Sequence, residues 1–261
     1  MSIDTKLITQ LREATGAGIG DCKEALEEAG SDLDKAVEIL RKKGAVKAAK
    51  KSERATSEGV ISFTKKGNKV AVAGLACETD FVSRNEDFIK TVDEFADKLM
   101  EIGEKDFKDW ADEKIKNELI VKIGENLKLV ASDIIEGDVV GVYLHSNKKV
   151  ASVVVLSGGD EELAVDLAMQ VTAMSPKYIK PEDVTSEEIE KEKEIYREQL
   201  KAEGKPEEMW EKIIPGKLNK YYQEVCLIKQ AYIKEDKKSV EQLLKEKGEN
   251  IEVVEFKRYQ I

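Results

Sequence analysis

The apolar side chains of residues 3–40 recur every three or four positions, which is the spacing of amphipathic helices. A glycine-rich stretch at 15–20 interrupts them and predicts a turn after a first helix. Asp21 is expected to open a second helix that ends at Gly30, and Ser31 is a suitable N-cap for a third. The pattern therefore predicts a small three-helix bundle.

Residues 41–54 carry almost no large apolar side chain, although lysine and alanine are frequent there. Gly44 follows the basic last turn of the third helix and is expected to end it. We therefore expect a solvated linker, which its alanines would allow to be helical. A basic segment can bind nucleic acid, but the net charge of −10 of the whole chain favours contact with an acidic partner.

From Gly59 onwards, apolar residues occur at every second position. Residues 60–64 and 70–75 flank Lys66-Gly67-Asn68, an arrangement that predicts a β-hairpin. The apolar positions within 88–99 then return to helical spacing. We expect two antiparallel strands followed by a helix that packs on them.

The same order of elements occurs again further along the chain. Two strand-like segments at 139–144 and 150–156 precede a helix with one apolar side, at 163–174. The repetition lies in the pattern and not in residue identity, and it predicts two related α+β subdomains. A last helix at 239–247 and a strand at 251–256 follow.

Residues 182–212 are rich in charge and poor in large apolar side chains. Helices at about 186–203 and 207–213 are separated by Gly204-Lys205-Pro206, and Pro215-Gly216 is expected to interrupt the second one. Because there is too little apolar surface to bury both helices against a core, they should project as an antiparallel helical hairpin.

These patterns predict an α+β protein with more than one domain, as its length of 261 residues also suggests. The expected parts are an N-terminal three-helix domain with its basic linker at 1–53, a core N-subdomain at 54–138, and a core C-subdomain at 139–261, into which the helical hairpin is inserted at about 182–225.

Composition and cysteine usage narrow the function classes. Cys22, Cys77 and Cys226 are widely spaced, and the lone His145 has no neighbouring ligand, so we expect reduced, buried thiols and no zinc site. No apolar run approaches the roughly 20 residues that a membrane-spanning helix needs. The first residues also lack a secretory leader, so a cytoplasmic protein is expected.

Two motifs invite a catalytic or nucleotide-binding interpretation, and neither is favoured. Gly16-x-Gly18-x-Gly20 resembles a phosphate loop, but it follows a helix and no Gly-Lys-Ser/Thr occurs, so direct nucleotide binding is not expected. The acidic helix after it disfavours DNA binding. No acidic residue and no nucleophile can be assigned to His145, so a hydrolase is the weakest alternative. We expect no enzyme, no cofactor and no metal.

Residues 77–85 lie between a strand and a helix, where functional residues gather. A purely structural interpretation is available. Thr79 or Asp80 would cap the helix, and Phe81 would pack into the core as a hydrophobic staple. On spacing alone, this structural interpretation is favoured over a functional one.

Two long segments carry a resemblance to a known family. Residues 11–26, Leu-Arg-Glu-Ala-Thr-Gly-Ala-Gly-Ile-Gly-Asp-Cys-Lys-Glu-Ala-Leu, closely resemble the N-terminal signature of translation elongation factor Ts. Residues 77–85, with Thr-Asp-Phe-Val at their centre, are similar to that family's second signature. Further segments that look like family landmarks are 122–126, 174–178 and 204–206.

The resemblance implies a bundle similar to ubiquitin-associated domains, a two-subdomain core with antiparallel sheets, and a protruding coiled coil. It also implies a guanine nucleotide exchange factor that releases GDP from elongation factor Tu without touching the nucleotide. In the family, the Asp-Phe pair of the second signature enters beside the Mg²⁺ site of Tu. The matching residues here are Asp80 and Phe81, flanked by Thr79 and Val82.

Other contacts with Tu can be carried over residue by residue. The N-terminal domain of the family contacts a helix of the GTPase domain, and the matching positions are Arg12, Ile19, Gly20 and Lys23. His145 matches a histidine that contacts the third domain of Tu. The stoichiometry stays open between a homodimer and a 2:2 complex with Tu.

Three departures from the family pattern limit the transfer. Gly20 stands where many relatives have methionine, Gln170 replaces a common histidine, and the sequence stops at Ile261 without the extra C-terminal helix of some relatives. The main alternative is a ubiquitin-associated-type adaptor that binds a helix and has no exchange activity.

Overall fold

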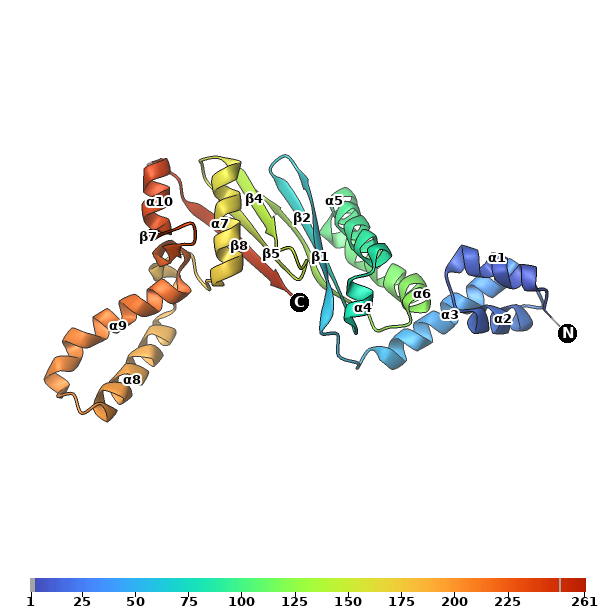
Figure 1. The fold of residues 1–261 in the computed structure, drawn as a ribbon, viewed down its shortest axis with the longest axis horizontal. Coiled ribbons are helices and arrows are strands. Elements are labelled where there is room, and N and C mark those ends of the chain that lie inside the picture. The colour runs from blue at the N-terminus through green and yellow to red at the C-terminus, as the bar shows by residue number, and fades with distance from the viewer. Residues whose placement is uncertain (1–2, 249) are drawn as a thin grey trace. The chain divides into compact units, whose positions relative to one another are not determined.

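The computed structural model describes residues 3–248 and 250–261 (Figure 1). The chain is an α+β protein with antiparallel sheets, as the sequence predicted. The domain boundaries, the likeness of the bundle to ubiquitin-associated domains and the coiled-coil character of the hairpin stay predictions. Two compact units are present: one contains the chain up to Ile135 with Ser146–Val150 and Tyr259–Ile261, the other Glu136–His145 and Ala151–Arg258.

The N-terminal helices enclose a core of their own. They are α1 (Thr5–Thr15), α2 (Ile19–Glu28) and α3 (Leu33–Lys51). The buried residues of this core are Leu11, Ala17, Cys22, Ala25, Leu26, Ala36 and Leu40. Helix α1 ends at Gly16, which adopts a left-handed φ of 69° that glycine reaches without strain.

The second and third helices begin at other residues than the pattern predicted. Helix α2 already starts at Ile19, before Asp21. The N-cap of α3 is Asp32, whose carboxylate accepts a hydrogen bond of 3.1 Å from the backbone N–H of Lys35. Ser31, the expected cap, has a φ of 70° and belongs to the preceding turn.

Helix α3 does not end at Gly44 but continues to Lys51. A Cβ atom on Gly44 would lie only 2.4 Å from Cγ2 of Val121. The glycine therefore lets α3 pack closely on a π-helical turn, η1 (Ile115–Leu119), and on α6 (Ile120–Ile123). The expected linker is helical and, at Gly44, buried instead of solvated.

The first sheet has the strand order β1-β2-β3. Strands β1 (Glu58–Lys66) and β2 (Lys69–Cys77) form the predicted hairpin. The sequence pattern did not predict β3 (Lys128–Glu136), because only Ala131 and Ile135 of its side chains are buried and no alternation results.

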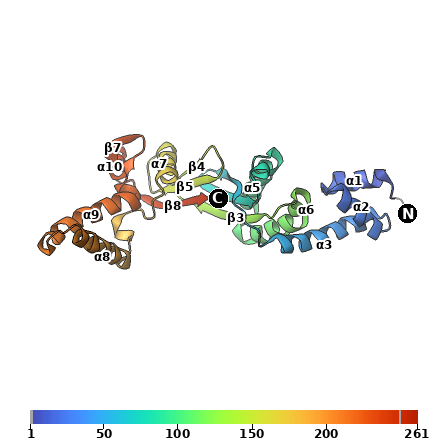
Figure 2. The ribbon, with the colours of Figure 1, turned by 60° about the horizontal axis from the view of Figure 1, so that its bottom comes forward.

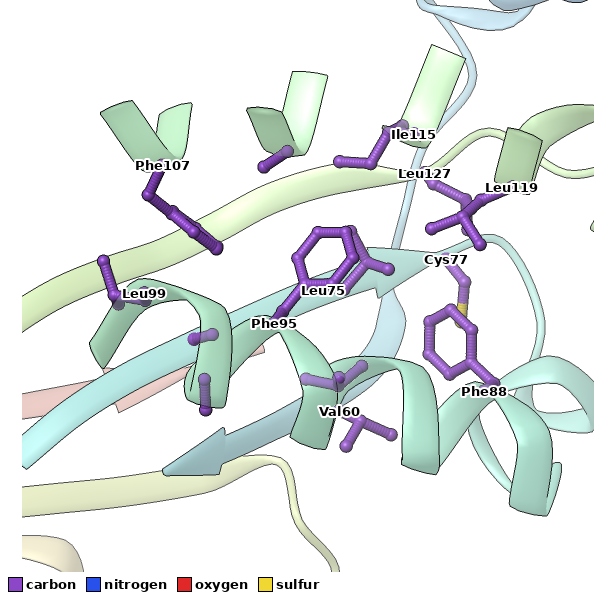
Figure 3. Close-up of a cluster of buried hydrophobic side chains, with 14 of the residues drawn as sticks. Val60, Leu75, Cys77, Phe88, Phe95, Leu99, Phe107, Ile115, Leu119 and Leu127 are labelled. Carbon is purple, nitrogen blue, oxygen red and sulfur yellow. The ribbon is translucent and has the colours of Figure 1, made fainter. Parts of the chain in front are cut away.

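Helix α5 (Glu86–Lys114) covers this sheet and folds back on itself. Gly103, with φ 80° and ψ 165°, interrupts the helix in a region of backbone space that is nearly exclusive to glycine. The rings of Phe95 and Phe107 consequently lie 5.9 Å apart, whereas a straight helix would separate these residues by about 18 Å (Figure 3). The returning half leads into η1 and α6.

The second unit repeats the order of hairpin and helix. Its sheet has the order β4-β5-β8. The strands are β4 (Val139–Leu144), β5 (Val150–Leu156) and β8 (Val253–Gln260), and α7 (Glu161–Met174) packs on β4. A Cβ atom on Gly141 would meet the backbone of Ala164 at 2.2 Å, so glycine permits this close approach.

The side chain of Gln170 ties α7 to a small hairpin. Its buried amide nitrogen donates to the side chain of Gln230 and to the carbonyl of Ala231, each at 3.1 Å, and its oxygen accepts from the N–H of Ile233 at 2.8 Å. The hairpin and the elements around it are η4 (Leu227–Lys229), β6 (Ala231–Tyr232), β7 (Glu235–Ser239) and α10 (Val240–Lys247).

Two helices of the second unit lie side by side in both views (Figures 1 and 2). They are α8 (Ser186–Ala202) and α9 (Trp210–Val225), with short 3₁₀ turns η2 (Pro181–Asp183) and η3 (Glu207–Met209) before them. Leu200, Ile214 and Leu218 form a buried cluster of their own between the helices. The interruption expected at Pro215-Gly216 is wrong, since α9 continues through Pro215.

Candidate functional site

The segment after β2 contains a one-turn helix, α4 (Asp80–Ser83). The side chain of Phe81 at its start is 85% exposed, while that of the next residue, Val82, packs against the core below α5. The interpretation of Phe81 as a core staple is therefore wrong. The loop holds a large aromatic side chain in solvent, where it is accessible to a partner.

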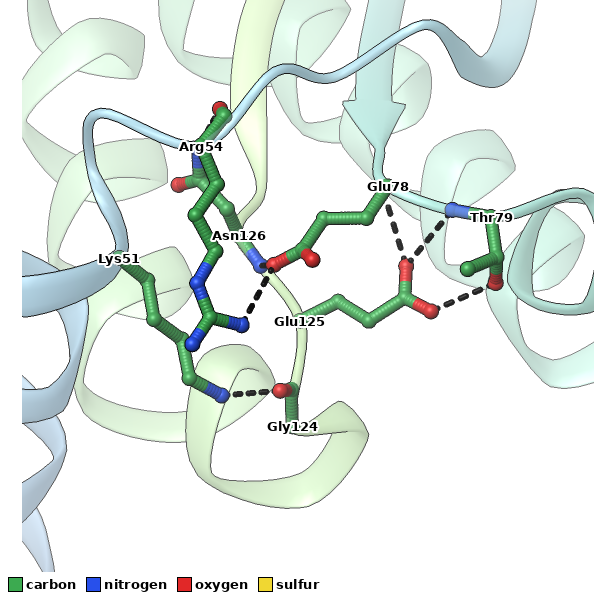
Figure 4. A network of polar contacts seen from close by, with 7 residues as sticks. All are labelled: Lys51, Arg54, Glu78, Thr79, Gly124, Glu125 and Asn126. Carbon is green, nitrogen blue, oxygen red and sulfur yellow. Dashed lines mark hydrogen bonds and ion pairs between the residues drawn. The ribbon is translucent and has the colours of Figure 1, made fainter.

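The carboxylate of Glu125 fixes the start of this loop (Figure 4). Its Oε2 accepts hydrogen bonds from the backbone N–H groups of Glu78, at 2.9 Å, and Thr79, at 3.1 Å. Its Oε1 accepts from the hydroxyl of Thr79 at 2.6 Å. The Thr79 side chain is thus engaged by Glu125 and does not cap α4, contrary to the expected capping role.

The carboxylate of Glu78 makes a second contact between the same two segments. Oε1 of Glu78 accepts a hydrogen bond of 2.6 Å from the backbone N–H of Asn126 and lies 3.5 Å from the guanidinium of Arg54. The buried amide of Asn126 donates to the carbonyl of Arg54 at 2.8 Å, and the ammonium of Lys51 donates to the carbonyl of Gly124. We call Glu78, Thr79, Glu125 and Asn126 the loop clamp.

The thiol of Cys77 is buried beside the clamp. Burial, followed by the nearby carboxylates of Glu125 and Glu58, raises the pKa of its thiol to about 12, so the thiol stays protonated near neutral pH. Burial also raises the pKa of Cys22 and that of Cys226, the latter to about 11. All three thiols are free and buried, as predicted.

The surface around Phe81 is partly apolar and carries one ion pair. Asp80 and Arg84 lie 3.2 Å apart, both exposed to solvent. A groove of about 280 Å³ runs beside the aromatic ring and is lined by Phe81, Val82, Asn85, Asp87, Phe88, Thr91, Leu119, Lys122 and Ile123. An aromatic side chain next to a shallow apolar groove is typical of a protein interface.

The candidate residues of the bundle occupy its exposed side. Arg12 and Ile19 line one groove of about 510 Å³ together with Ile8, and Ile19 is 59% exposed. Beyond the backbone of α2 and the chain neighbours of Gly20, none of the residues that the structure describes lies within 4 Å of the position that a Cβ on Gly20 would take. Lys23 forms an exposed contact of 3.9 Å with Glu27 of its own helix.

His145 belongs to the other unit, at the exposed end of β4, with its ring 6.5 Å from that of Tyr143. Among residues 3–248 and 250–261, no group of three or more histidine, cysteine or acidic side chains could hold a metal ion. Over the same residues, none of the helices combines the length and the hydropathy that a bilayer crossing requires.

Comparison with known proteins decides the family. The family model described as Elongation factor TS matches residues 78–261. A curated protein named Elongation factor Ts, from Idiomarina loihiensis, is 40% identical over 270 aligned positions that cover 100% of this chain and 91% of the relative. The chain belongs to the elongation factor Ts family. It is thus a factor of translation elongation in protein biosynthesis.

The family match begins at Glu78, the first residue of the clamp, so all four clamp residues lie inside it. Sequence reasoning placed residues 122–126 among the landmarks of elongation factor Ts but assigned them no role. Glu125 and Glu78 are 47 residues apart, and no local pattern indicates that they meet. The signal available was the resemblance of residues 122–126 to a family segment, which by itself assigns no role to Glu125.

Proposed function

We propose that this chain is the guanine nucleotide exchange factor of elongation factor Tu in the cytoplasm. It binds Tu·GDP and promotes GDP release by disturbing the Mg²⁺ and phosphate site of Tu. Family membership supports the partner. The observation that carries the mechanism is Phe81, a large aromatic side chain that is 85% exposed on a loop fixed by three hydrogen bonds that the Glu125 carboxylate accepts.

The mechanism follows from the charge of the metal ion. Mg²⁺ is among the largest local charges in a nucleotide site, so displacing the groups that hold it weakens GDP binding. Phe81 would enter beside that site, with Asp80 next to it and with Thr79 and Val82 fixing the backbone on either side. The exchange factor supplies no covalent chemistry. By linkage, bound GDP lowers the affinity of Tu for the exchange factor by the same factor by which the exchange factor lowers the affinity of Tu for GDP.

A single side chain does not supply the required free energy. A 10⁴-fold shift in GDP affinity needs about 5.5 kcal/mol of differential binding. We therefore assign further contacts to Arg12, Ile19, Gly20 and Lys23, against a helix of the GTPase domain, and to His145, against the third domain of Tu. The exposure of Ile19 and its groove with Arg12 support the first of these contacts.

Release of fluorescent GDP from Tu tests this function. Substoichiometric amounts of the chain should accelerate release, because each molecule acts repeatedly. An adaptor that only binds a helix would leave the rate unchanged, and that result would refute the proposal. Light scattering of the mixture distinguishes a 1:1 from a 2:2 complex.

A further inference from the structure

We propose that Glu125 is a positioning residue for exchange: it holds the Phe81 loop in its active geometry without contacting the partner. The inference rests on the proposed function, since it assigns a role within that reaction. One carboxylate accepts two backbone N–H groups and one hydroxyl from Glu78 and Thr79, immediately before Asp80 and Phe81.

Later in the loop, Val82 packs against the core and the buried Ser83 donates its hydroxyl to Glu58 at 3.4 Å, whereas the start of the loop is held by Glu125. Helix α4 is a single turn, its N-cap makes no side-chain hydrogen bond, and Phe81 itself is not held by a core. Hydrogen bonds to an ionised acceptor are about twice as strong as neutral ones, so the three Glu125 contacts are expected to fix the start of this segment. A loop that is already ordered loses less conformational entropy on binding than a loose one.

The clamp is built from both sides, which distinguishes it from a chance surface contact. Glu78 returns a hydrogen bond to the backbone of Asn126, and Asn126 is buried and bonded to the carbonyl of Arg54. Lys51, the last residue of α3, reaches the carbonyl of Gly124. The segment that follows the N-terminal bundle is therefore fastened to the same residues that hold the Phe81 loop.

The test compares Glu125→Ala with Glu125→Gln in the full-length chain, using fluorescent GDP release from Tu over a range of factor concentrations. The alanine variant should lower the maximal rate about tenfold, the size expected for losing a hydrogen bond to a charged group, with little change in the half-saturating concentration. The glutamine amide can still accept the backbone N–H groups and should retain most of the rate. Equal losses in both variants would overturn the positioning role.

Amide hydrogen exchange of the free protein supplies a readout that does not depend on Tu. Protection of the Glu78 and Thr79 N–H groups should fall in Glu125→Ala and stay at the wild-type level in Glu118→Ala. Glu118 is a matched control because its exposed carboxylate pairs with Lys114 of the same helical stretch, at 3.4 Å. Unchanged protection in Glu125→Ala would contradict the clamp, whether or not the chain exchanges nucleotide.

A double-mutant cycle separates this inference from the proposed function. If Glu125 acts through Phe81, then Glu125→Ala should change the rate less than about twofold in a Phe81→Ala background. If the rate losses of the two single variants multiply in the double variant, the two residues act independently. That result would overturn the inference and leave the proposed function intact. Failure of the wild-type chain to release GDP from Tu would refute the proposed function itself. The protection of the Glu78 and Thr79 amides from hydrogen exchange would still test the clamp.

Discussion

Glu78 and Glu125 each accept a hydrogen bond from the main chain of the other's segment: Glu125 from the N–H of Glu78 at 2.9 Å, and Glu78 from the N–H of Asn126 at 2.6 Å. The two carboxylates carry the same charge and lie on neighbouring segments. Each of them accepts a hydrogen bond from a backbone N–H group of the other segment. Neither segment can slide along the other without breaking both bonds. The position of Phe81 is consequently set by residues outside its own loop.

Replacement of Phe81 by alanine should leave the free energy of unfolding within about 0.5 kcal/mol of the wild type, because the ring is exposed. GDP release from Tu should slow markedly, since the side chain that enters beside the Mg²⁺ site is lost. Urea melts and fluorescent GDP release of the same preparation measure both effects. A loss of about 3–5 kcal/mol, as for a core phenylalanine, would contradict the assignment.

Asp80 requires a separate variant, because it stands at the start of α4 and pairs with Arg84 at 3.2 Å. Asp80→Asn keeps an oxygen acceptor and removes the charge. If the charge acts on the Mg²⁺ site, this variant should exchange slowly with unchanged stability. An exchange rate equal to that of the wild type would restrict the active role to Phe81.

Gly20→Met should tighten binding to Tu several-fold. The side chain has open space around it, and it would add apolar surface beside the exposed Ile19. Replacing a helical glycine should also stabilise α2 by about 0.8 kcal/mol. Titration calorimetry against Tu·GDP measures the affinity. Gly216→Met in α9, another glycine with open surroundings, is the matched control and should gain stability without affinity.

Gly44→Ala should destabilise the chain by about 1–3 kcal/mol, because the new methyl group would lie 2.4 Å from Cγ2 of Val121. In this background Val121→Ala should restore part of the loss, since it removes the clashing atom. Urea melts of the two single variants and the double variant measure the coupling. Strictly additive losses would show that α3 does not pack on α6 at this position.

Tyr178 and Tyr221 contact Glu188 in the first turn of α8, and from these contacts we expect the protein to lose stability at alkaline pH. Tyr178 and Tyr221 both donate to the carboxylate of Glu188, and this raises the pKa of Tyr178, while burial and then the same contact raise that of Tyr221. A phenol whose folded pKa exceeds its unfolded value of about 10 contributes stability below that pH, and the contribution is lost as the pH rises further.

Urea melts between pH 8 and pH 11 test this expectation. The free energy of unfolding should fall above about pH 10, where the unfolded phenols lose protons and the folded ones keep them. Glu188→Gln removes the negative acceptor, so it should reduce the slope of stability against pH in this range. A slope that is identical in the variant would show that these phenols do not carry the effect.

Local patterns predicted those elements whose formation depends on neighbouring residues. The β1–β2 hairpin follows from alternation on either side of a turn at Gly67, which has a φ of 59°. Helix α5 follows from the helical spacing of the apolar residues within 88–99, although its N-cap is Asn85 and not the expected Thr79 or Asp80. The family resemblance added the Thr79–Val82 motif. Each of these features lies within a short stretch of sequence, where spacing and capping chemistry are decisive.

Other positions were misjudged because the same local signal has two physical causes. A glycine after a basic turn, such as Gly44, is typical of a helix end. Here Gly44 lies inside α3 and permits a close contact with Val121 of α6. Pro215 is typical of a helix break, but α9 begins at Trp210 and continues through it to Val225. Strand β3 has no alternation, because few of its side chains are buried.

The sequence by itself determined the α+β class, most of the helices and strands, and the family to which the chain belongs. Only the tertiary structure decided that Phe81 faces solvent, that Glu125 holds the loop which carries it, and that α3 packs on α6. The reason is physical. Helix and strand patterns reflect interactions between residues a few positions apart, whereas the clamp joins residues 47 positions apart, which meet only when the whole unit is folded.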